Sequence, residues 1–354
     1  MQMHLKVFPA ANGDCLLLKL TNNKFNKNIL IDGGKGVLCH RKLKRELESI
    51  KNNKQYIDLL VLTHIDDDHI SGILKVYKDK KIDKTNIKNV WFNSGSLISD
   101  TLNGRSDKSR ELEIEPTSRK MSVRQGKTLE SLLKGNRTWS QYLITSGMKF
   151  TFDEVKVIVL SPDLDTLKDL NDKWDKELAK LKEKDRKKRE MSYENDYTVP
   201  ISELIDRPFI EDKSIFNRSS IAFMLEYGNK KILLLGDSHP SVISSSLRDL
   251  GYSERNKLKL NMIKVSHHGS KKNTNFEFLE LIDCKDFIIS SDGRNHGLPN
   301  KESLSKIICT MKRPITFHFN YLSMEKIFTK EECEEYDLSI RFLTEKNDYT
   351  LEVV

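Results

Sequence analysis

Residues 63–72, with the sequence THIDDDHISG, hold two imidazoles and three carboxylates within six consecutive positions. The apolar run before them, residues 56–62, is rich in strand-forming side chains and predicts a buried strand that ends where the polar cluster begins. Carboxylates this close together destabilise a folded loop unless a cation lies between them. A divalent metal ion is the simplest such cation. A solvated acidic turn that caps a helix is the alternative interpretation.

Other segments repeat this pattern of an apolar strand followed by polar residues. They are residues 231–238 (KILLLGDS, with Asp237), 262–270 (MIKVSHHGS) and 287–297 (FIISSDGRNHG, with His296). An earlier strand over residues 28–34 ends in Asp32 and two glycines, which would let the backbone pass close to the motif loop. Residues 217–228 predict a further strand that pairs with 231–238 around a Gly-Asn turn. We expect these strand ends to deliver their side chains to one common site.

The motif His-x-Asp-x-Asp-His, set between a hydrophobic strand and Ser-Gly, resembles the metal motif of the metallo-β-lactamase fold. Most members of that family carry a histidine at the position of Asp66. The aspartate form, together with His-His-Gly-Ser at 267–270, is similar to the hydrolase domain of ComEC-type DNA-uptake proteins and their soluble relatives. The resemblance implies an α/β fold, the αββα four-layer sandwich. It also implies a single domain over residues 1–354 with inserted regions at about 94–146 and 164–214.

The same resemblance implies roles for individual residues. Two divalent metal ions, zinc or manganese, would be bound by His64, Asp66, Asp68, His69, Asp237 and His267, with Asp237 bridging the pair. Catalytic roles would fall to Asp68, His268 and His296. Asp14, Asp32 and Asn217 would hold the ligands in place, and Ser270 and Lys271 would bind substrate. Which of the two adjacent histidines binds metal stays open, with His267 preferred.

The chain departs from the family pattern at three places. Asp66 replaces an imidazole, and residues 217–220 (NRSS) stand where many relatives carry another histidine ligand. Oxygen ligands suit harder cations, so manganese competes with zinc. Leu298 stands where relatives have the second histidine of His-Gly-His-Pro. Its function would then fall to His296, or the activity would be reduced.

Two metal ions lower the pKa of a bridging water and hold the oxygens of a phosphodiester for in-line attack. We therefore expect a metal-dependent hydrolase of phosphodiesters, specifically a nuclease, and the resemblance suggests a setting in phage defence. One alternative is a hydrolase of a small nucleotide or cyclic-nucleotide signal. Another is a non-catalytic regulatory or scaffold protein with a degraded metal site. The net charge of +8 permits an anionic substrate such as nucleic acid without identifying one.

Composition limits the remaining possibilities. No apolar run reaches the length of a membrane span and the first residues lack a signal-peptide core, so we expect a cytoplasmic protein without membrane contact. The five cysteines never form Cys-x-x-Cys and predict reduced thiols. The amphipathic helix expected over 164–191 ends in a charged tail, which we interpret as a solvated helix face. Partner proteins from the same operon are compatible with the resemblance, and the oligomeric state is not indicated.

Overall fold

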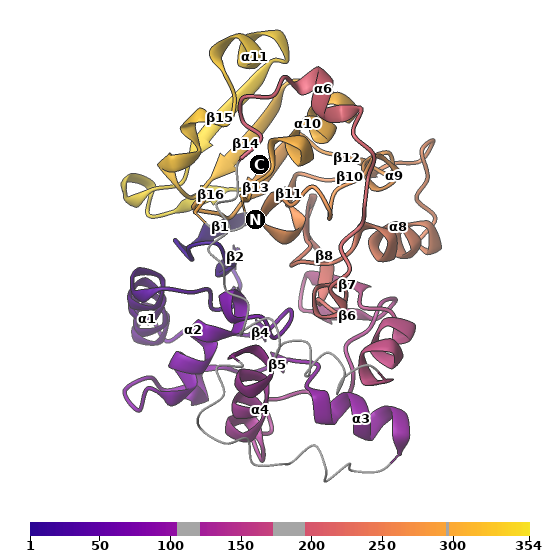
Figure 1. The fold of residues 1–354 in the computed structure, drawn as a ribbon. Coiled ribbons are helices and arrows are strands. Elements are labelled where there is room, and N and C mark those ends of the chain that lie inside the picture. The colour runs from indigo at the N-terminus through magenta and orange to yellow at the C-terminus, as the bar shows by residue number, and fades with distance from the viewer. Residues whose placement is uncertain (105–120, 173–194, 295–296) are drawn as a thin grey trace.

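The computed structural model describes residues 1–104, 121–172, 195–294 and 297–354. Most strands form two large sheets (Figure 1). In spatial order, the first sheet contains β16 (Thr350–Glu352), β1 (Gln2–Val7), β2 (Leu16–Thr21), β3 (Asn26–Ile31), β4 (Leu59–Val61) and β5 (Val90–Trp91). The second contains β15 (Leu338–Phe342), β14 (Ile315–Phe319), β13 (Asp286–Ile289), β11 (Met262–Lys264), β9 (Lys230–Leu234), β8 (Ala222–Tyr227), β7 (Val155–Ser161) and β6 (Lys149–Phe152). A small third sheet pairs β10 (Leu258–Lys259) with β12 (Ile282–Asp283).

Helices cover the outer face of each large sheet. The first sheet is covered by α1 (Val37–Asn52), α2 (Asp67–Lys78), α3 (Gly95–Asn103) and α4 (Met121–Leu133). The second is covered by α8 (Pro240–Asp249), α9 (Phe276–Leu279) and α10 (Lys301–Thr310). The remaining α-helices of the described ranges are α6 (Ile201–Ile205), α7 (Ile215–Arg218) and α11 (Lys330–Glu335).

Three apolar cores separate these four layers. On β2, Leu16 and Leu18 pack between the sheets with Phe223 of β8, whereas the intervening Leu17 packs outward with Leu43 of α1. This division follows from the alternation of side chains along a strand, which directs successive residues to opposite faces. A third core lies between the second sheet and its helices. The αββα sandwich predicted from the sequence is therefore confirmed.

Parallel pairing brings the polar strand ends together. The strands β3, β4 and β5 are parallel neighbours in the first sheet, and β9, β11, β13 and β14 are parallel neighbours in the second. Asp32 follows β3 directly, while His64, Asp237 and His267 each lie three residues beyond a strand. Because the carboxyl ends of parallel strands lie at one edge of a sheet, these residues meet in the crevice there.

The structure corrects one expectation about elements. Residues 217–220 do not begin a strand: α7 includes the first two, and β8 starts only at Ala222. The local reason is that the Ser214 side chain caps α7 and accepts a hydrogen bond from the Asn217 backbone N–H. In addition, the C-terminal β16 pairs antiparallel with β1, a long-range pairing that the local pattern did not reveal.

A buried ion-pair network ties α1 to the first sheet. The Glu46 carboxylate lies 2.5 Å from the Nζ of Lys6 on β1 and 2.5 Å from the Nζ of Lys19 on β2. Each carboxylate oxygen therefore has its own lysine partner, which reduces the cost of burying the charge.

In the part of the chain that the structure describes, no helix has both the length and the apolarity to cross a membrane.

Candidate metal centre

The loop between β4 and α2 carries the predicted motif. Asp66 is the N-cap residue of α2, and Asp68 and His69 lie in the first turn of that helix. The N-terminal end of a helix dipole favours negative charge, so it stabilises the aspartates there. A Cβ on Gly33 would stand 2.3 Å from the backbone nitrogen of Ile73 in α2, and a Cβ on Gly72 would stand 1.9 Å from the Gly33 carbonyl oxygen. The expectation that a glycine after β3 lets the backbone pass close to the motif loop is confirmed.

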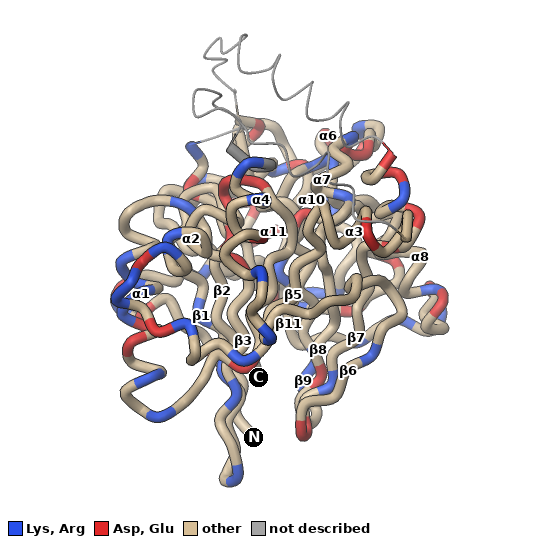
Figure 2. Tube along the Cα trace, turned by 90° about the horizontal axis from the view of Figure 1, so that it is seen from below, with Lys and Arg blue, Asp and Glu red and all other residues tan. Residues whose placement is uncertain are grey.

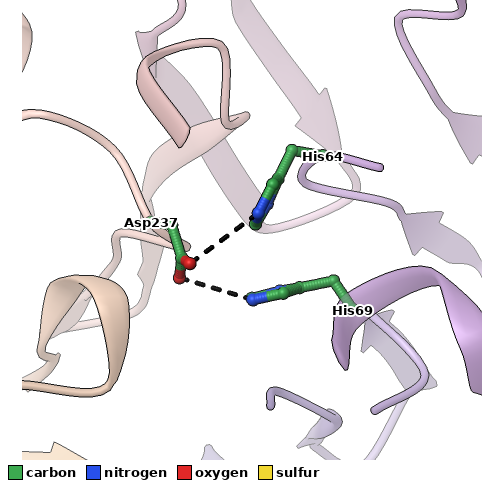
Figure 3. A group of neighbouring side chains, drawn as sticks. All are labelled: His64, His69 and Asp237. Atoms are coloured by element: carbon green, nitrogen blue, oxygen red, sulfur yellow. Dashed lines mark ion pairs between the residues drawn. The ribbon is translucent and has the colours of Figure 1, made fainter. Parts of the chain in front are cut away.

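Asp237, just after β9, is the residue on which histidines from both halves of the chain converge. The Nε2 of His69 lies 3.4 Å from Asp237 Oδ1, and the Nε2 of His64 lies 3.7 Å from Asp237 Oδ2. Figure 3 shows the two rings pointing at the carboxylate from the motif loop and the start of α2. All three side chains are at most 4% exposed. A carboxylate and two imidazoles are thus brought together away from solvent.

His267 and His268 follow β11 in a short 3-10 turn, η4 (Ser266–Gly269). Their φ angles are 46° and 55°, in the left-handed region that residues other than glycine rarely adopt. The turn directs the two rings to different oxygens of Asp237. The Nε2 of His267 lies 3.7 Å from Oδ2, and the Nε2 of His268 lies 3.7 Å from Oδ1. The geometry therefore brings both histidines, and not only the preferred His267, to the carboxylate.

The other ring nitrogen of three of these histidines faces an oxygen. The pairs are His69 Nδ1 with Asp32 Oδ2 at 2.7 Å, His268 Nδ1 with the Ser290 carbonyl oxygen at 3.0 Å, and His267 Nδ1 with Asn273 Oδ1 at 2.9 Å. Carboxylate and carbonyl oxygens only accept hydrogen bonds, so each Nδ1 carries a proton and donates it. In the neutral ring, Nε2 then presents a lone pair toward Asp237, which is the arrangement of a metal-binding histidine.

The side chains around Asp237 divide into two groups, one beside each of its carboxylate oxygens, which we call the inner and the outer position. The inner position lies at Oδ1 and is surrounded by Asp68, His69 and His268, with Asp68 Oδ2 3.6 Å from His268 Nε2. The outer position lies at Oδ2 and is surrounded by His64, Asp66 and His267, with Asp66 Oδ2 3.7 Å from His64 Nε2. The side chains of Asp66 and His267 are 36% and 25% exposed, so the outer position is closer to solvent.

Charges within the cluster shift the pKa values of its members. Burial would raise the pKa of the Asp237 carboxyl, but the neighbouring histidines outweigh burial and hold it well below its usual range. Burial would lower the pKa of His69, yet Asp237 and Asp32 raise it well above its ordinary value. The same opposition, with Asp237 and Asp212 as the negative charges, raises the pKa of His267 to about 9. Protons on the imidazoles therefore offset the carboxylates, and a bound cation would replace that positive charge.

Several buried atoms of the cluster fit a metal ion. Within the part of the chain that the structure describes, the Nε2 atoms of His64, His69 and His268 and the Oδ1 atom of Asp237 are buried without a hydrogen-bond partner. Each such atom costs about 1–3 kcal/mol. The ligand atoms of His64, His69 and Asp237 lie within 4.8 Å of one another, as do those of Asp68, His69 and His268. Imidazole and carboxylate donors in this mixture suit zinc and manganese.

The residues expected to hold the ligands lie close to them. Besides the contact of Asp32 with His69, Asp14 Oδ1 lies 3.4 Å from His268 Nδ1, and Asn217 Nδ2 lies 3.4 Å from His267 Nδ1. Where another histidine was expected, the Ser220 hydroxyl lies 3.2 Å from His64 Nδ1. Ser220 thus contacts the ring on the side away from Asp237.

The remaining expected site residues are placed differently. Ser270 is buried, and its hydroxyl accepts a hydrogen bond from the Lys272 backbone N–H. The Nζ of Lys271 lies 3.5 Å from Glu302. These contacts hold the turn after His268 in place, and substrate binding by Ser270 and Lys271 stays a prediction. His296 lies outside the described residues.

The sequence interpretation missed three residues of the site. Asn12 Nδ2 donates to Asp68 Oδ2 at 2.8 Å, Lys264 forms a buried ion pair with Asp14, and Asp212 Oδ2 lies 3.5 Å from His267 Nδ1. A signal existed for Lys264, because a lysine inside a buried apolar strand requires a carboxylate partner. Nothing in the local pattern around Asn12 or Asp212 indicates their contacts.

No protein-family model and no curated protein matches this chain. Solved structures that it resembles include the metallo-β-lactamase fold protein YhfI from Bacillus subtilis, at 12% identity over 99% of both chains with a TM-score of 0.41. Zn²⁺-bound PqqB from Methylobacterium extorquens is 10% identical over 96% of this chain and 98% of that one, with a TM-score of 0.42. CmlA, a diiron β-hydroxylase from Streptomyces venezuelae, is 9% identical over 99% of this chain but 53% of its own, with a TM-score of 0.39.

The fold assignment depends on the molecule's own architecture. Two sheets face each other across one core, helices cover both outer faces, and the His-x-Asp-x-Asp-His loop lies where the parallel strands of both sheets end. These are the features that the resemblance implied. This chain therefore has the αββα fold that the resemblance to the metallo-β-lactamase fold implied, with a candidate metal centre at the strand ends.

Proposed function

We propose that this chain is a metal-dependent hydrolase of phosphodiesters that acts as a nuclease. The observation that carries the proposal is the convergence of four imidazole Nε2 atoms on the two oxygens of Asp237. Asp66 and Asp68 add one carboxylate to each of the two positions. Paired metal positions that share a carboxylate suit in-line displacement at phosphorus.

A different set of residues would bind a metal ion at each of the two positions. His69, His268 and Asp68 would hold one ion at the inner position, and His64, His267 and Asp66 a second at the outer position. Ions bound there would lower the pKa of a bound water and polarise the phosphoryl oxygens. Asp68, held by the Asn12 amide, would also orient the attacking water. His268 is better suited to metal binding than to direct catalysis, because its side chain is only 1% exposed.

The nature of the substrate is supported less directly. Basic and acidic residues are interspersed along the described chain (Figure 2). The net charge of +8 favours an anionic substrate in general. Support for nucleic acid comes from the resemblance of the His-x-Asp-x-Asp-His and His-His-Gly-Ser motifs to ComEC-type proteins. We extend the proposal to a cytoplasmic role in phage defence and to one domain over residues 1–354, with insertions at about 94–146 and 164–214.

The test combines metal analysis with a substrate screen. We expect the purified protein to retain two zinc or manganese ions and to degrade DNA or RNA when manganese is supplied. Asp68→Asn should reduce the activity by more than about 100-fold, because it removes a metal ligand from the inner position. Asp79→Asn is the matched control, since that carboxylate pairs with Lys44 at the opposite end of α2 and should leave activity unchanged.

Other results would redirect the assignment. Turnover of cyclic dinucleotides and bis(p-nitrophenyl) phosphate without cleavage of DNA or RNA would show a hydrolase of small nucleotides in place of a nuclease. Absence of both activities, together with little retained metal, would overturn the hydrolase proposal in favour of a scaffold protein.

A further inference from the structure

The segment before α7 contacts the metal centre from outside. Asp212 Oδ2 lies 3.5 Å from His267 Nδ1 and 3.7 Å from His239 Nε2, and it accepts a hydrogen bond from Asn217 Nδ2 at 2.7 Å. The Asp212 side chain is 12% exposed. Since His267 turns its other nitrogen, Nε2, toward Asp237, Asp212 lies behind the ring and not at the outer metal position.

Backbone and side-chain contacts hold this segment against the histidine turn. The backbone N–H of Asp212 donates to the Lys272 carbonyl oxygen at 3.1 Å, close to η4. Glu211 accepts hydrogen bonds from both the backbone N–H and the hydroxyl of Ser241, each at 3.0 Å, at the start of α8. The turn itself has positive φ at His267 and His268, a conformation that persists only when its surroundings support it.

His267 depends on these polar contacts more than the other histidines do. Its side chain is 25% exposed, whereas those of His64, His69 and His268 are at most 1% exposed. Close packing therefore adds to the hydrogen bonds that orient the other three rings, whereas His267 depends more on its polar contacts. Asn273 provides one such contact: its Oδ1 accepts from His267 Nδ1, while its Nδ2 donates to the Asp237 carbonyl oxygen at 3.1 Å. Asp212 places a negative charge at that side of the ring, 3.5 Å from Nδ1.

We infer that Asp212 is a positioning residue that directs His267 to the outer metal position. The inference rests on the proposed two-metal function and deepens it. It also accounts for the departure at residues 217–220, the place where the resemblance implies another histidine ligand. That region contributes Asn217 instead, whose amide holds Asp212, and Asp212 in turn holds a histidine from another strand end. The outer position thus keeps two imidazoles without the histidine at 217–220.

The test measures how tightly each of the two ions binds, independently of activity. Metal-free wild-type protein titrated with Mn²⁺ is expected to bind two ions and to give the electron paramagnetic resonance spectrum of a coupled pair. Asp212→Asn should weaken the second ion by about 10- to 100-fold and leave the first unchanged, so that the spectrum of an isolated ion appears. Glu211→Gln is the matched control, because Glu211 bonds Ser241 and not His267. It should bind both ions as the wild type does.

A second variant tests the same role of Asp212 if Asp212→Asn does not fold. Asn217→Ala removes the amide that holds the Asp212 carboxylate at 2.7 Å and that also lies 3.4 Å from His267 Nδ1, and it is expected to weaken the same single ion. Unchanged binding of both ions in the variant that folds, or equal weakening of both, would overturn the role of Asp212. A wild-type protein that binds fewer than two ions would instead overturn the two-metal proposal itself, so the two failures are distinguishable.

Discussion

Asp32→Asn is the substitution that tests the architecture of the inner position most directly. The Asp32 carboxylate is fully buried and accepts three hydrogen bonds. Its Oδ1 accepts from the Thr63 backbone N–H at 2.8 Å, and its Oδ2 accepts from the Thr63 hydroxyl and from His69 Nδ1, each at 2.7 Å. Asparagine has the same shape but only one acceptor oxygen. An amide N–H₂ group must therefore face either the backbone N–H or the imidazole.

Both orientations of the amide are unfavourable, one for stability and the other for metal binding. If the N–H₂ group faces the Thr63 backbone, two donors oppose each other and a bond to a charged acceptor is lost, at about 1.5–3 kcal/mol. If it faces His69, the imidazole avoids the conflict by moving its proton from Nδ1 to Nε2. Nε2 is the atom that lies 3.4 Å from Asp237 Oδ1, and once protonated it cannot bind a metal ion. We expect an affinity loss of about 10- to 100-fold at the inner position.

The assay is competition with a chelator at fixed pH, with urea unfolding of the metal-free protein beside it. The control is Asp58→Asn, because Asp58 also accepts a backbone N–H, that of Asn28 at 3.0 Å, and among the described residues it contacts lysines but no histidine. The control should lose some stability and keep the wild-type metal affinity. Wild-type affinity in Asp32→Asn, or an equal loss in both variants, would refute the reasoning.

Three further predictions concern stability. Gly72→Ala should destabilise the protein by about 1–3 kcal/mol in thermal unfolding, since its Cβ would stand 1.9 Å from a backbone oxygen. Gly126→Ala, whose nearest atom would be a side-chain methyl at 3.2 Å, should be tolerated. Lys264→Met should cost about 3–5 kcal/mol in urea unfolding by leaving the buried Asp14 charge unpaired, and adding Asp14→Asn should recover part of that loss. Burial would raise the pKa of Glu46, but its two lysine partners outweigh burial and lower it. Its contribution is therefore complete above the ordinary value of 4.5 and is lost as the pH falls. The difference in unfolding free energy between wild type and Glu46→Gln should accordingly shrink on acidification, and a constant difference would contradict this account.

The sequence by itself determined the layers and the candidate ligands. The resemblance of the His-x-Asp-x-Asp-His motif predicted the αββα layers, in which successive side chains on a strand, such as Leu16 and Leu17, face different cores. Polar residues just after apolar strands predicted a shared site, because the carboxyl ends of parallel strands meet at one edge. Those two rules use only local pattern, so they could be applied before any contact was known.

Tertiary structure decided how the histidines divide between the oxygens of Asp237 and which residues hold them. The left-handed backbone at His267 and His268 sends adjacent rings to different oxygens, and no local pattern predicts that conformation for histidine. Asp212 and Asn12 contact the site through loops whose positions depend on distant parts of the chain. The pairing of β16 with β1 likewise joins the two ends of the sequence. The physical reason is the same in each case: hydrogen bonds between segments far apart in sequence depend on packing of the whole fold, and local residue types carry little information about it.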